Sequence, residues 1–323
     1  MSKLEINQLD LFSGIGGFHL GFERAGYKVN SYFSEIDKHA VAVYKQQFKD
    51  STYVGSVTDV RGADLPRIDL ITFGSPCQDF SLAGKRKGME GERSSLILEA
   101  IRLINECRPR AFVWENVKGT FSSNDGEDFA AILQAFTNIG GYRLEWQLLN
   151  TSWFLPQNRE RIYLVGYSTT TKRNWRGVFP IREANQSNSE LECSRKAITK
   201  CLTARGQEGH AGMQLVKVIE PMIYDDYNSR LRTDGNVGTI TQNIGIAAPR
   251  SGQKIIQSDY RIRRLTPIEC ERLQGFPDNH TAFGIYDDQK KPMSNTQRYK
   301  QCGNAVTVDV VQAVAEQCKP LFK

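Results

Sequence analysis

Short apolar runs alternate with segments of helical periodicity through the first half of the chain. The runs have the length of buried strands, and the segments between them repeat apolar residues at the spacing of one helix face. Strands are predicted at 8–12, 28–34, 68–73, 111–116, 142–150 and 162–167, and helices at 17–26, 37–48, 94–107 and 127–139. The predicted fold class is α/β, a doubly wound and mostly parallel Rossmann-like sheet, in which ligands bind at the carboxyl ends of the strands.

The pattern changes after Tyr167. Residues 168–260 are rich in Ser, Thr, Asn, Gly and Arg, and they contain short strand-like pieces without helical periodicity. Helical periodicity returns at 263–278 and 301–318, so we expect the C-terminal part to pack back on the first domain. The predicted domains are 1–167 plus 261–323, and a smaller, irregular, β-rich domain at 168–260.

Composition narrows the class of protein. A chain of 323 residues with 40% hydrophobic and 24% charged residues is ordinary for a globular protein. There is no membrane-length apolar stretch and no secretory signal pattern, so we expect a cytoplasmic protein. The net charge of +6 weakly favours a polyanionic partner. Seven cysteines without a CxxC pair argue against a disulfide framework and a structural zinc site, and no metal site is expected.

A glycine-rich turn joins the first predicted strand to the first helix. In DLFSGIGGF (10–18), Gly14, Gly16 and Gly17 allow a ligand to approach backbone N–H groups at a helix N-terminus. Glu35 follows the second strand, where a carboxylate binds ribose hydroxyls in nucleotide-binding folds. The spacing differs from GxGxxG, which favours a nucleoside cofactor without pyrophosphate, such as S-adenosylmethionine, over NAD. The alternative is a glycine-rich turn without a ligand.

Cys77 occupies an unusual position in GSPCQDFS (74–81), directly after Pro76 at the end of a strand. A thiol there could act as a nucleophile if nearby groups favour its thiolate form, whereas the other six cysteines are expected to be inert. The segment that follows, 81–93, contains Lys85 and Arg86 and is either a solvated loop or a mobile lid that contacts phosphates.

Glu115 and two arginines complete the candidate chemistry. Glu115 ends a strand in ENV (115–117), where burying a carboxyl group is costly unless it has a bonding partner or a function. In QNRER (157–161), Arg159 and Arg161 are spaced to lie on one face of a strand. A cysteine, a glutamate and two arginines in one crevice suit thiol attack on an electron-poor heterocycle. The alternative for the arginines is a surface pair bonded to acidic neighbours.

These motifs occur in a recognisable order. With DLFSGIGGF, GSPCQDFS, ENV, QNRERIYLVG, RRLTPIECERLQGFPD and QCGNAV, the sequence resembles the bacterial cytosine-5 DNA methyltransferases of restriction–modification systems. The resemblance implies that Cys77 adds to carbon 6 of a flipped-out cytosine and that carbon 5 then takes the methyl group of S-adenosylmethionine. It also implies that Glu115 binds the N3 and amino edge of the base, and that Arg161, with Arg159 beside it, binds O2. The base must leave the duplex because carbon 6 is unreachable inside the stack.

The resemblance also assigns binding residues. The cofactor is expected to contact Phe12, Gly14, Gly16, Gly17, Glu35, Pro76, Leu96, Asn304 and Ala305. Double-stranded DNA is expected to contact the lid at Ser81, Lys85 and Arg86, and base-reading loops at 201–212 and 238–245, the latter with Thr239 and Thr241. Residues 168–260 correspond to the target recognition domain. We expect a monomer without membrane contact, because asymmetric reading by one chain needs no partner. The resemblance leaves open whether a cognate restriction endonuclease exists; such an enzyme would act on the same site without direct contact.

One position departs from the family pattern. An aspartate that binds the adenine amino group usually follows the glycine of GSVTDV (55–60), but this chain has Ser56 there. We expect weaker cofactor binding, or substitution by Asp59.

Two other functions remain open at this stage. An RNA cytosine methyltransferase could use the same scaffold, but the region of roughly 90 residues after Tyr167 favours DNA. A non-catalytic DNA-binding relative is disfavoured by intact Cys77, Glu115 and Arg161. The recognition sequence cannot be derived from the loop residues.

Overall fold

The structure is a computed structural model that describes residues 3–75, 95–170, 177–182, 222–225, 230–232, 253–256 and 262–323. Its centre is a seven-stranded sheet of order β3-β2-β1-β4-β5-β7-β6. The strands are β1 (Leu4–Leu11), β2 (Tyr27–Ser34), β3 (Thr52–Tyr53), β4 (Leu70–Gly74), β5 (Ala111–Val117), β6 (Tyr142–Asn150) and β7 (Glu160–Ser168). The first five pair in parallel, and β7 runs antiparallel to β5 and β6. The predicted α/β class with a mostly parallel sheet is confirmed.

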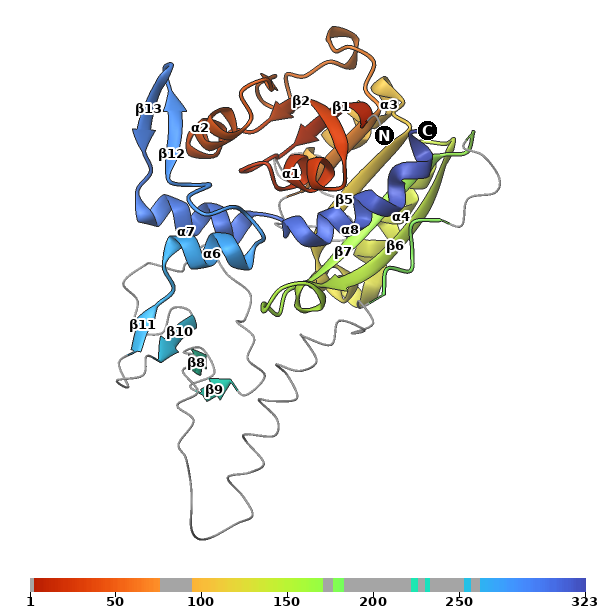
Figure 1. Ribbon diagram of the computed structural model, residues 1–323. Helices are drawn as coiled ribbons and strands as arrows, with labels where there is room; N and C mark the ends of the chain where they lie inside the picture. Colours follow the sequence, from red (N-terminus) through yellow and green to blue (C-terminus); the bar gives the residue numbers. More distant parts are fainter. Residues whose placement is uncertain are drawn as a thin grey trace, which may run out of the picture.

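Helices cover both faces of this sheet (Figure 1). The helices before the second sheet are α1 (Gly17–Arg24), α2 (Lys38–Gln47), α3 (Ser95–Cys107) and α4 (Glu127–Asn138), with short 3-10 turns at Gly62–Asp64, Lys118–Phe121, Ser123–Gly126 and Thr151–Trp153. Strand β5 shows why two layers form: Ala111 and Val113 face the core that contains α1, whereas Phe112 and Trp114 face the core that contains α3 and α4. Because both faces are buried, the strand reads as a continuous apolar run.

The C-terminal part begins with α6 (Pro267–Leu273), whose start is fixed by a capping box between Thr266 and Glu269. A hairpin of β12 (Phe283–Tyr286) and β13 (Gln289–Pro292) follows, then α7 (Asn295–Asn304), α8 (Val308–Cys318) and a 3-10 turn at Lys319–Leu321. Helix α8 packs on α1 in Figure 1, and the Tyr27 hydroxyl donates to the Ala315 carbonyl at 2.9 Å. The expected return of the C-terminus to the first domain is therefore confirmed.

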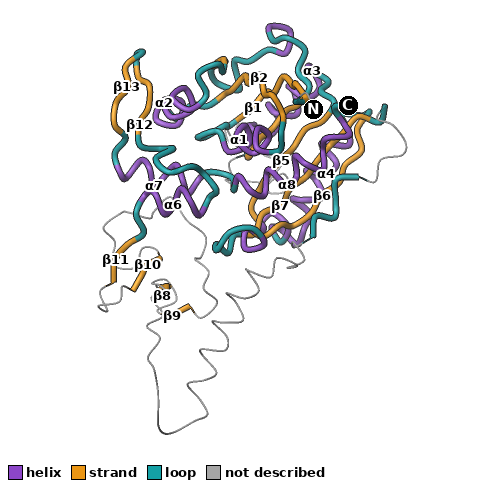
Figure 2. Tube along the Cα trace, in the orientation of Figure 1, coloured by secondary structure: helices purple, strands orange, loops and turns teal. Residues whose placement is uncertain are grey.

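A second, four-stranded antiparallel sheet has the order β11-β10-β8-β9. Its strands are β8 (Met222–Asp225), β9 (Arg230–Arg232), β10 (Gln253–Ile256) and β11 (Ile262–Arg264), drawn as short orange segments in Figure 2. Most of 168–260 lies outside the described residues, so the domain boundaries at 168 and 260 stay predictions. Within the described residues, no helix is long and apolar enough to cross a bilayer.

Candidate active site

The carboxyl edge of the sheet contains the candidate site. The chain runs from β1 outward to β2 and β3 and then crosses back to β4 and β5. The topological switch point therefore lies at the carboxyl ends of β1 and β4, where the strand order reverses. Open α/β sheets bind their ligands at this point. Strand β1 ends at Leu11 just before the glycine-rich turn, and β4 ends at Gly74, three residues before Cys77.

The turn after β1 has a left-handed backbone. Phe12, Gly14 and Gly16 have φ angles of 52°, 54° and 84°. A Cβ atom on Gly16 would collide with the ring of Phe48, whereas one on Gly14 would meet no described residue within 4 Å. Space is therefore open beside Gly14, while Gly16 is needed for packing.

Glu35 organises this turn from the end of β2. Its Oε2 accepts a hydrogen bond from the Gly14 N–H at 2.9 Å, and its Oε1 accepts from the N–H groups of Ile36 and Asp37 at 2.8 and 2.9 Å. The next side chain, Ile36, is 80% exposed. The hydroxyl of Ser13 is buried without a hydrogen-bond partner among the described residues. The turn after β1 and the end of β2 thus bring together a carboxylate, a glycine with open space, an exposed apolar side chain and a hydroxyl without a partner among the described residues.

Glu115 and Arg161 form a second group at the same edge. The two residues lie on adjacent strands, and the Glu115 Oε1 atom is 3.2 Å from Arg161 Nε. Both side chains are largely buried, and Glu115 Oε1 accepts no hydrogen bond in the described part of the chain. Gly74 pairs with Glu115, and a Cβ there would lie 3.1 Å from its Oε2. An ion pair with an unsatisfied acceptor can still bind a polar substrate edge.

Arg159 has a different environment. It is buried, and its Nη1 and Nη2 donate to the carbonyls of Gly303 and Ala305 at 3.4 and 2.9 Å. Burial and, to a smaller extent, the charge of Arg161 lower the pKa of Arg159 to about 10, although Glu115 opposes both effects. The guanidinium therefore stays protonated at neutral pH and connects the segment before β7 to the end of α7.

The end of β4 is held by side chains of β5. Ser75 is buried, and its hydroxyl accepts from Trp114 Nε1 at 3.0 Å and lies 3.4 Å from Asn116 Nδ2. These contacts fix the last described residue before Pro76 and Cys77. The asparagine of ENV thus has a structural partner next to the predicted nucleophile.

The structure brings several predicted cofactor residues together. Ala305 accepts from Arg159, and its neighbour Val306 packs on the glycine-rich turn, where a Cβ on Gly17 would lie 2.6 Å from Val306 Cγ2. Asn304 is exposed at the end of α7. Phe12 and Leu96 both pack against the core cluster on the α3 side of the sheet. The remaining site residues of the sequence analysis lie outside the described residues: Pro76, Cys77, Ser81, Lys85, Arg86, Thr239 and Thr241.

The sequence analysis did not single out Ser13, Ile36, Ser75 and Gln157. Gln157, the first residue of QNRER, is fully buried, and neither side-chain polar atom has a partner among the described residues. The exposure of Ile36 and the burial of Gln157 appear only in the structure, so no sequence signal could have found these two residues.

Comparison with known proteins decides the family. The model of the family described as C-5 cytosine-specific DNA methylase matches residues 6–320. The chain belongs to this family. It is therefore a DNA cytosine-5 methyltransferase that uses S-adenosylmethionine as methyl donor and flips its target base.

Relatives in the family are bacterial methyltransferases. The type II methyltransferase M1.ScrFI of Lactococcus lactis subsp. cremoris is 35% identical over 314 residues, which cover 96% of this chain and 77% of the relative. The type II methyltransferase M.NlaX of Neisseria lactamica is 35% identical to this chain, and the match covers 95% of that relative.

Solved structures show the same fold. The S. pombe Dnmt2 methyltransferase matches with a TM-score of 0.64 at 18% identity, covering 98% of this chain and 99% of that one. A putative DNA modification methyltransferase encoded within an E. coli prophage matches with a TM-score of 0.57 at 20% identity, covering 98% and 99%.

The Arg159 contacts lead to a stability prediction for this methylase. Replacing Arg159 with lysine is expected to lower the free energy of unfolding by about 2 kcal/mol, because an ammonium group cannot reach both carbonyls and a buried charge stays under-bonded. Arg182→Lys, at an exposed position, is the matched control. Urea denaturation of both variants measures the difference; equal midpoints for the two variants would show that the Arg159 bonds contribute nothing.

Proposed function

We propose that the enzyme methylates one cytosine within a specific short duplex sequence, with Cys77 as nucleophile and Glu115 and Arg161 as the base-binding groups. The observation that carries this proposal is the buried Glu115–Arg161 pair at the carboxyl edge, with its unsatisfied Glu115 oxygen. Strand β4, which leads to Cys77, is hydrogen-bonded to β5, which carries Glu115. The three groups can therefore reach one flipped base.

The proposed chemistry assigns one task to each side chain. The Cys77 thiolate adds to carbon 6 of the cytosine, and the Glu115 carboxylate takes a proton from solvent and passes it to N3, so that the ring accepts the electron pair of the new bond. Arg161 holds Glu115 in place and donates to O2 of the base. S-adenosylmethionine supplies an electrophilic methyl group for carbon 5. Carbon 5 then loses its proton to water, the Cys77 sulfur departs with the electron pair of its bond to carbon 6, and N3 gives its proton back to Glu115.

Arg159 acts differently in this proposal. Its guanidinium is occupied by the carbonyls of Gly303 and Ala305, so it positions the end of α7 beside the glycine-rich turn instead of touching the base. This departs from the role beside Arg161 that the sequence resemblance implies.

The residues around the glycine-rich turn fit the cofactor. Open space beside Gly14 allows close approach of a ligand, and the half-buried Glu35 carboxylate can accept from ribose hydroxyls. Ile36 offers an apolar surface for an adenine ring, and the Ser13 hydroxyl offers a donor for the methionine carboxylate. Phe12, Gly16, Gly17, Pro76, Leu96, Asn304 and Ala305 complete the proposed cofactor site.

DNA recognition is proposed for 168–260, with Thr239 and Thr241 in a base-reading loop. The segment with Ser81, Lys85 and Arg86 is proposed as a lid that contacts phosphates. The type II names of the relatives support a role as the modification enzyme of a restriction–modification system, beside an endonuclease that needs no contact with this chain. A cytoplasmic monomer suits this role, because one chain with one recognition domain can read an asymmetric site.

Ser56 gives a prediction about cofactor affinity. Its hydroxyl lies 2.9 Å from the Thr58 hydroxyl, and Asp59 is exposed beside them. Ser56→Asp is expected to tighten S-adenosylmethionine binding about three- to tenfold, because a carboxylate accepts more strongly than a hydroxyl from an adenine amino group. Isothermal titration measures this, with Thr58→Asp as control. Unchanged affinity in Ser56→Asp would sink the idea that this position faces the adenine.

The substrate class is tested by methyl transfer from tritiated S-adenosylmethionine to duplex DNA and, separately, to total RNA. We expect transfer to DNA with saturating kinetics and only background transfer to RNA. Transfer to RNA without transfer to DNA would overturn the proposed substrate.

A further inference from the structure

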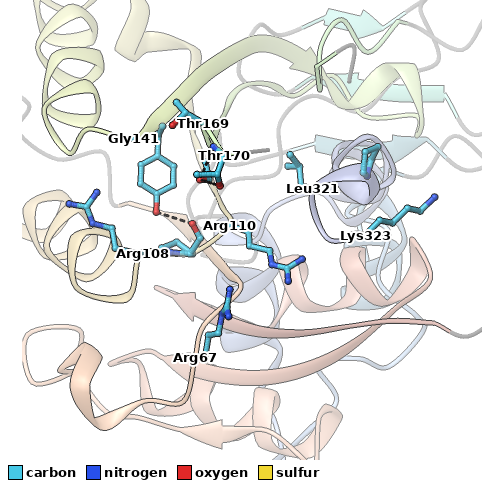
Figure 3. Close-up of a pocket in the computed structure, with 12 residues that line it drawn as sticks. Arg67, Arg108, Arg110, Gly141, Thr169, Thr170, Leu321 and Lys323 are labelled. Atoms are coloured by element: carbon cyan, nitrogen blue, oxygen red, sulfur yellow. Dashed lines mark hydrogen bonds between the residues drawn. The ribbon is translucent and has the colours of Figure 1, made fainter. Parts of the chain in front are cut away.

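A pocket lies at the edge of the central sheet opposite the candidate active site (Figure 3). Its residues come from segments that are far apart in sequence but meet at the strand ends. Arg67 precedes β4, Arg110 directly precedes β5, Tyr142 begins β6, and Ser168 ends the antiparallel β7. This is the amino edge of the parallel strands, whereas Glu35 and Glu115 lie at the carboxyl edge. The pocket is therefore separate from the methyl-transfer site.

The pocket has the size of a small-molecule site and a cationic lining. Its volume is about 480 Å³, and it is lined by three arginines, Arg67, Arg108 and Arg110, together with Lys323. The hydroxyls of Thr169 and Thr170 add possible donors. In Figure 3 the Arg67 and Arg110 side chains extend into the same space between the strand ends.

These positive charges are poorly neutralised by the protein. Arg110 Nε lies 3.6 Å from the Asp69 carboxylate. Among the described residues, none of the three arginines has another carboxylate partner. Asp69 also accepts from the Asn7 N–H at 3.1 Å, so its charge is shared. Arg67 is exposed and forms no ion pair with a described residue. Two arginine side chains that extend into one space, with Asp69 as their shared counter-charge, favour binding of an anion.

Arg108 is hydrogen-bonded to neutral groups. Its Nη1 donates to the carbonyls of Ile139 and Gly140 at 3.1 and 2.9 Å, and its Nη2 donates to the Asn105 side-chain oxygen at 2.6 Å. All three acceptors are neutral. Arg108 therefore contributes a fixed positive field to the pocket, while Arg67 and Arg110 remain able to turn toward a ligand.

We propose that this pocket binds a phosphate group, presented either by a free nucleotide or by the backbone of a second DNA segment. Guanidinium groups match the geometry of phosphate oxygens and bind them with charge-assisted hydrogen bonds. The apolar walls formed by Pro109, Tyr142 and Leu321 suit the organic part of a phosphorylated ligand. Such a site would let the enzyme sense a nucleotide, or hold a second duplex, without occupying the candidate active site.

The first test measures inorganic pyrophosphate binding to the full-length enzyme by isothermal titration. The variants are Arg67→Gln and the double variant Arg67→Gln/Arg110→Gln, with Arg61→Gln as a matched control at an exposed arginine outside the pocket. A free phosphate ligand predicts binding to the wild type and the control, about tenfold weaker binding to Arg67→Gln, and none to the double variant. Thermal unfolding shows separately that each variant is folded.

The second test measures the number of short dA·dT duplexes bound per chain by analytical ultracentrifugation. These duplexes lack cytosine, so the test does not depend on methyl transfer or on the role of Cys77. A DNA ligand predicts two duplexes per wild-type chain and one per chain of the double variant, which keeps the candidate active site. If the double substitution changes neither pyrophosphate binding nor duplex stoichiometry, the phosphate site is refuted.

Discussion

Replacing Cys77 with serine is expected to abolish methyl transfer, by more than about a thousandfold, while DNA and S-adenosylmethionine still bind. A serine hydroxyl is almost fully protonated at neutral pH and has no assigned base to activate it, so addition to carbon 6 fails. Initial rates of tritium transfer measure the loss, and gel shift and titration calorimetry measure binding.

The matched control for this experiment is Cys107→Ser. Cys107 is a half-buried free cysteine on α3, and burial raises its pKa to about 11, so it lacks thiolate character. The control enzyme is expected to turn over normally and to form a covalent complex with a duplex that contains 5-fluorocytosine, whereas Cys77→Ser forms none. Normal turnover by Cys77→Ser would mean that another group is the nucleophile.

Replacing Glu115 with glutamine is expected to lower kcat about 10²- to 10⁴-fold, with little change in cofactor affinity. Glutamine keeps the volume of the side chain but cannot transfer a proton to N3 of the base. It also removes the negative charge opposite Arg161, whose Nε is 3.2 Å from the Glu115 carboxylate. The glycine-rich turn is hydrogen-bonded to Glu35 and not to Glu115, so the cofactor should still bind.

Glu160→Gln is the control for this prediction, because Glu160 adjoins Arg161 on β7 but pairs with Lys118 near the surface. Single-turnover rates at saturating DNA and cofactor measure the chemical step in both variants. A Glu115→Gln enzyme as fast as Glu160→Gln would contradict the proposed role of the carboxyl group in catalysis.

The sequence predicted the centre of the parallel sheet because its buried strands at 68–73 and 111–116 are largely apolar runs. It could not predict the polar hairpin at 283–292, whose Gln289–Pro292 strand is exposed and has no apolar periodicity. It also did not reveal that helical periodicity at 301–318 is broken between Asn304 and Val308. There Ala305 and Thr307 have extended backbone angles, and the Ala305 carbonyl accepts from Arg159.

The sequence predicted the residues of the candidate site but not the contacts between them. Motif order brought Glu115 and Arg161 to attention, but their pairing depends on β7 lying antiparallel beside β5, which hydrophobic periodicity does not specify. The contacts of Arg159 join segments 144 and 146 residues apart. The cationic pocket around Arg67 and Arg110 combines several distant segments without a motif, so it could be found only in three dimensions.

The central claim, that this chain methylates one cytosine in a specific duplex sequence through Cys77, is tested most directly in a cell. The measurement is base-resolution sequencing of 5-methylcytosine in DNA from a methylation-free host that expresses the protein, with Cys77→Ala as control. The account predicts methylation at a single short motif and none in the control. Unmethylated DNA despite folded, cofactor-binding protein, or methylation that persists in Cys77→Ala, would contradict it.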